Sequence, residues 1–285
     1  MAYPIVDSAY GFRPINRIDG LPYAGAVRQV PIAKSYGTSI FYGDLVGLAA
    51  GTIIRSAITT STTTSAVAGT LGVFMGCSYT NPTTGQKLFA QYWPASTAAN
   101  DAVAYVVDDP KAAFRVAVLS QSSSVTNTVT AIGYASEAMI GTNVYAVTGT
   151  AGSTISGDAK NGVSGDNPTN GSGMVRVTTA LPFRVVDIVR DNPVTLTGSG
   201  TCSTTTLTLD AAVTGLKAGM QFVCPGVTNA DYGDYNLVTN VNTTTVTVSK
   251  SVTISSSATV YFIGYPEVIV KWNQGYHSYE NATGV

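Results

Sequence analysis

Short runs of β-branched and aromatic residues, separated by turn-forming residues, recur along most of the chain. Residues 27–32, 71–77, 103–107 and 114–118 are such runs, and Asn81-Pro82 is one of the turn signals between them. Valine, isoleucine, threonine and aromatic residues favour strands, whereas glycine, proline and asparagine favour turns. Short strands with a turn about every 8–12 residues are typical of a β-sandwich or barrel. We therefore predict an all-β fold, with a β-sandwich or barrel as the main domain.

The composition indicates a folded chain and argues against two classes of partner. Of the 285 residues, 11% are charged and 45% are hydrophobic, whereas disordered chains combine high charge with low hydrophobicity. The net charge of −1 argues against nucleic acid, because its phosphates are held by lysine and arginine. The longest apolar stretch, residues 45–54, is far shorter than the roughly 20 residues of a membrane-spanning helix. We expect neither a nucleic acid nor a membrane as partner, and the first residues lack the features of a secretory signal.

The residues that usually carry enzyme chemistry are almost missing. A Ser-His-acid triad would have to use the one histidine, His277, which lies in an aromatic segment and reads better as a packed or interface residue. Cys77, Cys202 and Cys224 lack the short spacing of a zinc site. Three cysteines are also too few for a disulfide scaffold, which favours reduced thiols and synthesis in a cytoplasm, although Cys202 and Cys224 would be able to pair inside one small module. No phosphate-binding, dinucleotide-binding or nucleophile-elbow motif is present. We expect no enzymatic activity, no cofactor and no metal.

Two acidic clusters allow a second reading. Asp108-Asp109-Pro110 follows a strand-like run, and Asp231-Tyr232-Gly233-Asp234 lies further along the chain. Aspartate and proline initiate tight turns, whereas a calcium loop needs alternating oxygen ligands closed by a glutamate. A turn is the better interpretation of both clusters.

The N-terminal residues 1–30 read as an extended arm. Prolines and glycines interrupt the segment, and its aromatic residues follow no period. It either straps over its own domain or packs on a neighbouring subunit, and aromatic and arginine side chains favour the second. The interface candidates in the arm are Tyr3, Tyr10, Phe12, Arg13 and Tyr23.

The C-terminal tail is the second candidate for an interface. It contains Trp272, Tyr276, His277 and Tyr279. Chain ends usually fray, so this aromatic density predicts burial, either in the main domain or between subunits.

The main domain and an inserted module differ in composition. Residues 193–264 form a threonine-rich unit of four or five short strands, whereas residues 31–192 and 265–285 read as one larger β domain. Within that domain the glycine-rich strand 71–77 predicts bulges or close backbone contacts, and residues 148–173 read as an exposed loop. The runs 185–189 and 267–272 on either side of the module read as strands of the same domain, so we expect the module to be an insertion.

Several stretches of the main domain share a recognisable pattern. They are Met1-Ala2-Tyr3-Pro4, Tyr10-Gly11-Phe12-Arg13-Pro14, Phe41-Tyr42-Gly43-Asp44-Leu45-Val46, Gly72-Val73-Phe74-Met75-Gly76-Cys77-Ser78-Tyr79, Gln91-Tyr92-Trp93-Pro94-Ala95, Val107-Asp108-Asp109-Pro110 and residues 265–285. Together they resemble a family of capsid decoration, or cement, proteins of tailed bacteriophages, found widely in marine phages and cyanophages. Shorter members of the family run directly from the late strand to the tail, without an inserted module.

The resemblance implies a virion structural protein. Such a protein is made in the cytoplasm of the bacterial host and binds the outer surface of the capsid, with the major capsid protein as its partner. A protein that cements a lattice sits at a symmetry element, so we also expect a homo-oligomer, with a trimer favoured over a dimer. The main alternative is a tail or receptor-binding, adhesin-like virion protein, whose inserted module would bind glycans. A major capsid protein fits less well, because the common shell fold needs a long helix, and a depolymerase fits less well because no catalytic set is visible.

Overall fold

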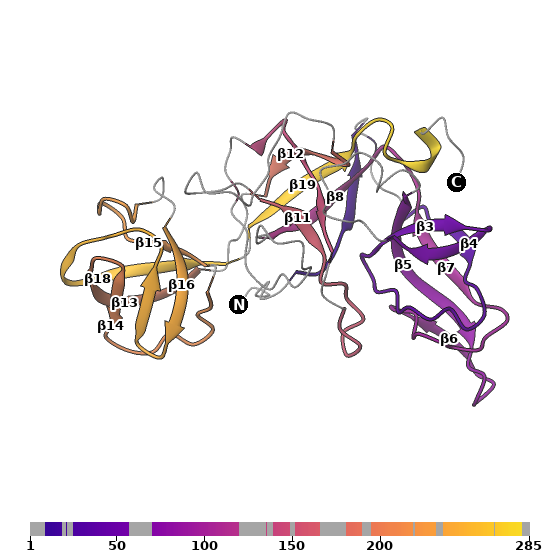
Figure 1. The fold of residues 1–285 in the computed structure, drawn as a ribbon, viewed down its shortest axis with the longest axis horizontal. Coiled ribbons are helices and arrows are strands. Elements are labelled where there is room, and N and C mark those ends of the chain that lie inside the picture. Colours follow the sequence, from indigo (N-terminus) through magenta and orange to yellow (C-terminus); the bar gives the residue numbers. More distant parts are fainter. Residues whose placement is uncertain are drawn as a thin grey trace.

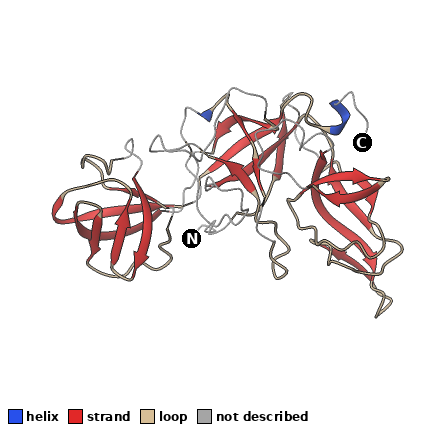
Figure 2. Ribbon diagram, viewed as in Figure 1, coloured by secondary structure: helices blue, strands red, loops and turns tan. Residues whose placement is uncertain are grey.

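The protein is all-β, as predicted. The computed structural model describes residues 9–18, 21, 25–56, 70–119, 135, 139–148, 152–165, 181–189, 195–218, 220–231, 236–264 and 266–280. Nearly all regular structure in these residues is strand, with a short 3-10 helix at Ser278–Glu280 (Figure 2). The strands form two open sheets and one closed barrel (Figure 1).

The central sheet has seven strands in the order β10-β11-β8-β19-β12-β9, with β1 paired to β8. The strands are β1 Arg13–Arg17, β8 Ala112–Leu119, β9 Asn143–Val144, β10 Ala146–Val147, β11 Gly162–Ser164, β12 Phe183–Ile188 and β19 Glu267–Trp272. An aromatic cluster fills its core: the ring of Phe183 lies 4.9 Å from that of Phe12 and 4.4 Å from that of Trp272. Stacked and tilted ring contacts of this kind stabilise a core beyond the area that they bury.

The start of the chain joins this core, which corrects part of the expectation of an arm over residues 1–30. Arg13–Arg17 pairs antiparallel with β8 as β1, with a bulge between Pro14 and Asn16. Phe12, just before the strand, is fully buried among the central core residues. The proline tolerated at the second position of β1 and the single strand partner are typical of an edge strand.

The distal sheet has six strands in the order β2-β7-β5-β3-β4, with β6 paired to β5. The strands are β2 Arg28–Pro31, β3 Leu45–Ala49, β4 Thr52–Arg55, β5 Thr70–Thr80, β6 Lys87–Ala90 and β7 Val103–Val107. Its own core is closed by Trp93, which is fully buried and lies edge-on to Tyr79 at 5.3 Å. Trp93 is held there by paired backbone hydrogen bonds with Ile40 of 2.7 and 3.2 Å.

The central and distal sheets share buried residues. In β3 and β5, adjacent residues point to opposite cores: Leu45 and Val73 belong to the central core, whereas Val46 and Phe74 belong to the distal core. A strand that is buried on both faces has a continuous apolar run instead of an alternating one. This explains why the sequence 71–77 has no polar face.

Glycine at position 72 allows the backbones of β5 and β7 to approach closely. A Cβ atom at Gly72 would lie 2.0 Å from the carbonyl oxygen of Val107. The register of β5 against β7 shifts between Phe74 and Cys77. Both features confirm the bulges and close contacts predicted for this glycine-rich strand.

Residues 195–263 form a closed six-stranded barrel in the order β13-β14-β17-β16-β15-β18. The strands are β13 Thr195–Ser203, β14 Thr206–Leu209, β15 Gln221–Val223, β16 Asn236–Asn242, β17 Thr245–Val248 and β18 Ile254–Ile263. Its core contains only residues of the barrel itself, including the rings of Phe222 and Phe262 at 5.9 Å. Cys202 and Cys224 are buried, free thiols in the structure.

In the sequence, the barrel is inserted between β12 and β19, which are neighbouring strands of the central sheet. β12 and β19 pair antiparallel, with Ile188 opposite Val268. The N–H of Val189, where the chain leaves β12, donates to the carbonyl of Glu267 at 3.0 Å. The points at which the chain leaves and rejoins the central sheet are therefore adjacent (Figure 1).

Candidate functional site

The described residues bring no set of metal-ligating side chains together. No three His, Cys, Asp or Glu side chains within the described ranges are placed to hold a metal ion. No helix in the described part of the chain has the length and apolarity to cross a membrane.

His277 is a packed residue. Its side chain is fully buried, with ring centroids 5.5 Å from Trp272 and 5.2 Å from Tyr279. Its Nδ1 accepts a hydrogen bond from the backbone N–H of Tyr279 at 3.3 Å. Burial lowers the pKa of His277 below its usual 6.5, because desolvation disfavours the charged form. A neutral, enclosed imidazole of this kind stabilises the tail and does not face a substrate.

The C-terminal tail is buried mainly in the main domain, the first of the two alternatives that its sequence left open. Trp272 and Tyr276 belong to the central core and are 3% and 8% exposed. Tyr279 is the exception among the four predicted interface residues of the tail, since it is 52% exposed. Of these four side chains, Tyr279 is therefore the one with a large surface open to a partner.

The arm candidates in the described residues also make contacts within the chain. The hydroxyl of Tyr10 donates to Glu267, and burial, followed by this bond, raises the pKa of Tyr10. Arg115 also binds Glu267, through Nε at 2.8 Å and through a second nitrogen. The guanidinium of Arg13 lies 4.0 Å from the ring centroid of Tyr42.

Arg13 also forms an ion pair with Asp158 at 2.6 Å. With Phe12 fully enclosed, these contacts leave the first part of the predicted arm interface largely occupied by its own domain. Tyr3 and Tyr23 lie outside the described residues.

The arm and the tail meet at the turn that follows β7. The Tyr279 hydroxyl donates to Asp108 at 2.7 Å, and Arg28 both donates to the Tyr279 hydroxyl and lies 3.5 Å from the same carboxylate. Arg17 lies 3.3 Å from Asp109. Oδ1 of Asp109 accepts the backbone N–H of Lys111 at 2.8 Å, which confirms the predicted turn. The sequence pattern indicated the turn, but not that its aspartates bind Arg17 and Arg28 of the arm and Tyr279 of the tail.

Large apolar side chains are exposed around this turn. Leu21 and Ile18 are 55% and 43% exposed, and Val27 is 41% exposed. Ile18 is tied to the turn by its N–H, which donates to the carbonyl of Lys111 at 3.0 Å, and the N–H of Arg17 donates to the carbonyl of Leu21 at 3.0 Å. We call Ile18, Leu21, Val27, Arg28, Asp108 and Tyr279 the terminal surface. Apolar surface rimmed by polar groups is typical of protein contacts.

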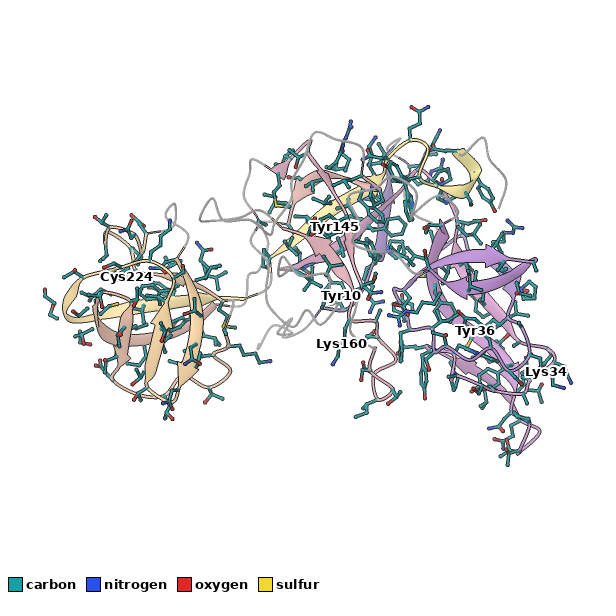
Figure 3. All side chains as sticks on the ribbon, viewed as in Figure 1. Tyr10, Lys34, Tyr36, Tyr145, Lys160 and Cys224 are labelled. Atoms are coloured by element: carbon teal, nitrogen blue, oxygen red, sulfur yellow. The ribbon has the colours of Figure 1, made fainter. Side chains whose placement is uncertain are left out.

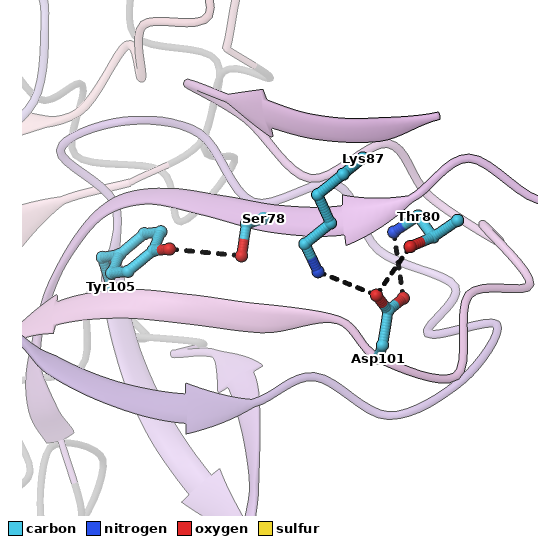
Figure 4. Close-up of polar contacts among 5 residues, drawn as sticks. All are labelled: Ser78, Thr80, Lys87, Asp101 and Tyr105. Carbon is cyan, nitrogen blue, oxygen red and sulfur yellow. Dashed lines mark hydrogen bonds and ion pairs between the residues drawn. The ribbon is translucent and has the colours of Figure 1, made fainter. Parts of the chain in front are cut away.

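The outer face of the distal sheet is a second exposed surface. Phe89 on β6 is 77% exposed. The Tyr105 hydroxyl donates to Ser78 at 3.2 Å, and Lys87 pairs with Asp101 at 2.7 Å (Figure 4). The hydrogen bond from Lys87 is the main reason why the pKa of Asp101 lies below its usual value. β6 ends at Ala90, so Phe89 is exposed on this strand whereas Trp93, beyond its end, is buried.

Comparison of the chain with known protein families, with curated proteins and with solved structures finds no match.

Proposed function

We propose that the protein is a virion structural protein that binds the outer surface of a tailed-phage capsid and stabilises the shell. The observation that carries this proposal is the terminal surface, where residues between Ile18 and Arg28 and the tail residue Tyr279 lie at the turn after β7 and apolar side chains are exposed. Apolar and aromatic residues, with arginine, are the groups that interface cores favour. The family resemblance of the sequence supports the same function.

The stretches that carry the resemblance have structural roles. The N–H of Phe12 donates to the carbonyl of Gly43 at 3.0 Å, and the N–H of Gly43 donates to the carbonyl of Phe74 at 2.8 Å. Three of the resembling stretches therefore meet at one crossing between the central and distal sheets. A protein whose task is to present a surface needs a rigid body more than reactive groups, and this arrangement fits that task.

The proposed partner is the major capsid protein, together with further copies of this chain. A protein that binds only the assembled shell stabilises that state by mass action. Copies at a symmetry element of the lattice would contact one another, and a trimer is favoured over a dimer. Such repeated contacts suit a chain in which only 11% of residues are charged.

A matched pair of substitutions tests the proposal. Ile18→Asp places a charge on the terminal surface, whereas Ile155→Asp makes the same change at a side chain that is 99% exposed on the 152–158 turn. We expect Ile18→Asp to weaken binding to phage heads that lack the protein by at least tenfold, which corresponds to about 1.4 kcal/mol. Ile155→Asp should bind like the unmodified protein. Equal binding of both variants would contradict the assignment of this surface.

A tail or receptor-binding protein remains the second candidate function. The barrel favours it, because its strands expose many threonine and serine side chains, such as Thr206, Thr208 and Ser255. Electron microscopy of virions labelled with an antibody against this chain distinguishes the two: label on the head supports the decoration protein, and label on the tail supports the alternative.

A further inference from the structure

The barrel carries a groove on its outer side, between β13 and the loop that follows β14. Its volume is about 480 Å³, which lies in the range of about 300–1,000 Å³ that is typical of small-molecule sites. Hydroxyl-bearing, apolar and glycine residues line it: Leu196, Thr197, Gly198, Ser199, Ala211, Ala212, Val213, Thr214 and Thr259. None of these lining residues is charged.

The sequence fixes the shape of this groove through a close contact. A Cβ atom at Gly198 would lie 2.9 Å from a methyl carbon of Val213, so glycine in β13 lets the loop pack directly on the strand. The N–H of Asp210 donates to the carbonyl of Ser199 at 2.9 Å, and that of Leu216 to the carbonyl of Val213 at 3.3 Å. The first bond attaches the start of the loop to β13, and the second closes a turn within the loop.

A carboxylate at the edge of the groove orients two hydroxyl groups. Oδ2 of Asp210 accepts hydrogen bonds from the Ser199 hydroxyl at 2.7 Å and from the Ser257 hydroxyl. These two bonds, that of Ser257 first, hold the pKa of Asp210 below its usual value. Asp210 thus remains ionised, and Ser199 links it to the lining of the groove.

An aromatic ring lies on the same face of the barrel. Tyr261 on β18 is directly opposite Thr197 on β13, and residues that face each other across an antiparallel pair project to the same side of the sheet. The Tyr261 side chain is partly exposed. The face therefore combines hydroxyls, one carboxylate, methyl groups and a tyrosine.

These groups suit a ligand that is neutral and rich in hydroxyl groups. Serine and threonine hydroxyls both donate and accept hydrogen bonds, and the two oxygens of an ionised carboxylate accept several. An apolar ligand would leave these groups unpaired, which is costly. An anionic ligand would meet Asp210 without a lysine or arginine in the lining to balance it. We infer that this groove binds a neutral carbohydrate, with Asp210 and Ser199 both accepting hydrogen bonds from sugar hydroxyls and the alanine and valine side chains packing against the ring.

Binding of the full chain to arrayed oligosaccharides tests this inference. The array carries neutral hexose oligosaccharides (glucans, galactans and mannans), with sialylated and sulfated oligosaccharides as the anionic comparison. We expect binding to at least one neutral class and none to the anionic classes. Titration calorimetry with the bound neutral oligosaccharide then gives the affinity of each variant.

Three variants locate the site. Ala212→Trp fills the groove at an exposed loop position and should abolish binding, and Asp210→Asn should weaken it at least tenfold. Asn240→Trp is the control, because Asn240 is exposed on β16, the strand opposite β13 in the order around the barrel, and it should bind like the unmodified protein. Absence of binding to every neutral oligosaccharide at millimolar concentration overturns the inference, and so does binding that survives Ala212→Trp. The result does not depend on whether the protein lies on the head or the tail, so it can fail or succeed separately from the proposed function.

Discussion

At the scale of residues, the few charged side chains connect parts of the chain that are distant in sequence. Asp44 is fully buried, accepts the N–H of Phe41 at 2.8 Å and lies 3.2 Å from Arg55. Asn161 donates to the same carboxylate. Burial nevertheless raises the pKa of Asp44 above its usual value, because desolvation outweighs the neighbouring positive charge. Side chains are shown on the ribbon in Figure 3.

Buried His277 predicts a pH dependence of stability at the same scale. Its pKa in the folded protein lies below 6.5 because of burial, so at pH values below about 6.5 the unfolded chain binds a proton that the folded chain does not. The contribution to stability is complete above pH 6.5 and decreases as the pH falls toward the pKa of the folded state. The variant His277→Gln lacks this titration. We therefore expect the stability difference between the unmodified protein and His277→Gln to become less favourable to histidine from pH 8 to pH 5.

Chemical unfolding of both proteins at a series of pH values measures this difference. The carboxylates near His277, Asp108, Asp109 and Glu280, are present in both proteins, so their own titration largely cancels in the comparison. A difference that stays constant over the whole range would show that His277 does not titrate differently on folding.

At the scale of elements, the fold depends on backbone segments that approach each other more closely than a side chain allows. Gly43 has a φ of 92°, and a Cβ atom there would lie 2.9 Å from the carbonyl oxygen of Tyr10. Gly72 has ordinary φ but is still closer to its neighbour, Val107. These close approaches give a physical reason for glycine at both positions. Both glycines lie in the sequence stretches on which the resemblance is based.

Substitution at Gly72 tests the importance of this crossing. In Gly72→Ala the new methyl group overlaps the carbonyl of Val107, which is backbone and does not move aside easily. We expect a loss of at least about 2–3 kcal/mol in the free energy of unfolding. Gly37→Ala is the control, because a Cβ atom there meets nothing within 4 Å, and its effect should stay within about 0.5 kcal/mol. Thermal unfolding of both variants gives the comparison, and similar midpoints would contradict the argument.

The sequence predicted where longer strands form better than it predicted which strands pair with each other. The all-β class, the strand at 103–107 and the bulged strand at 71–77 follow from residue type and glycine content alone. Residues 148–173 read as an exposed loop, yet Gly162–Ser164 forms the buried strand β11, which pairs parallel with β8. A three-residue strand carries too little pattern to be recognised, and its partner is set by long-range packing.

The same limit applies to the candidate surfaces. The arm and the tail were each predicted as candidate interface segments from their aromatic residues. Their contact at Asp108 was not predictable, because Asp108 is about 80 residues from Arg28 and is separated by 171 residues from Tyr279. Burial of Phe12 and Trp272 in the same core was not readable either, because aromatic residues serve cores and interfaces equally well.

At the scale of the whole molecule, the chain contains one body of two sheets that share buried residues and one barrel with a core of its own (Figure 1). The first and last strands of the barrel pair with each other from Thr195 opposite Ile263 onward. A closed barrel has no unpaired strand edges. Both observations predict that the barrel and the two-sheet body fold independently.

Replacement of residues 194–264 by a short linker tests this independence. Val189 and Glu267 are already joined by a backbone hydrogen bond of 3.0 Å, so a glycine-serine linker of about four residues, together with the retained residues 190–193 and 265–266, is long enough to connect β12 to β19. We expect the shortened protein to remain folded, to bind phage heads as the full chain does under the proposed function, and to lose carbohydrate binding. The excised barrel should give its own cooperative unfolding transition, although a core of this size supports only modest stability. A shortened protein that folds but no longer binds heads would place capsid binding in the barrel, and one that does not fold would show that the two-sheet body depends on the barrel despite their separate cores.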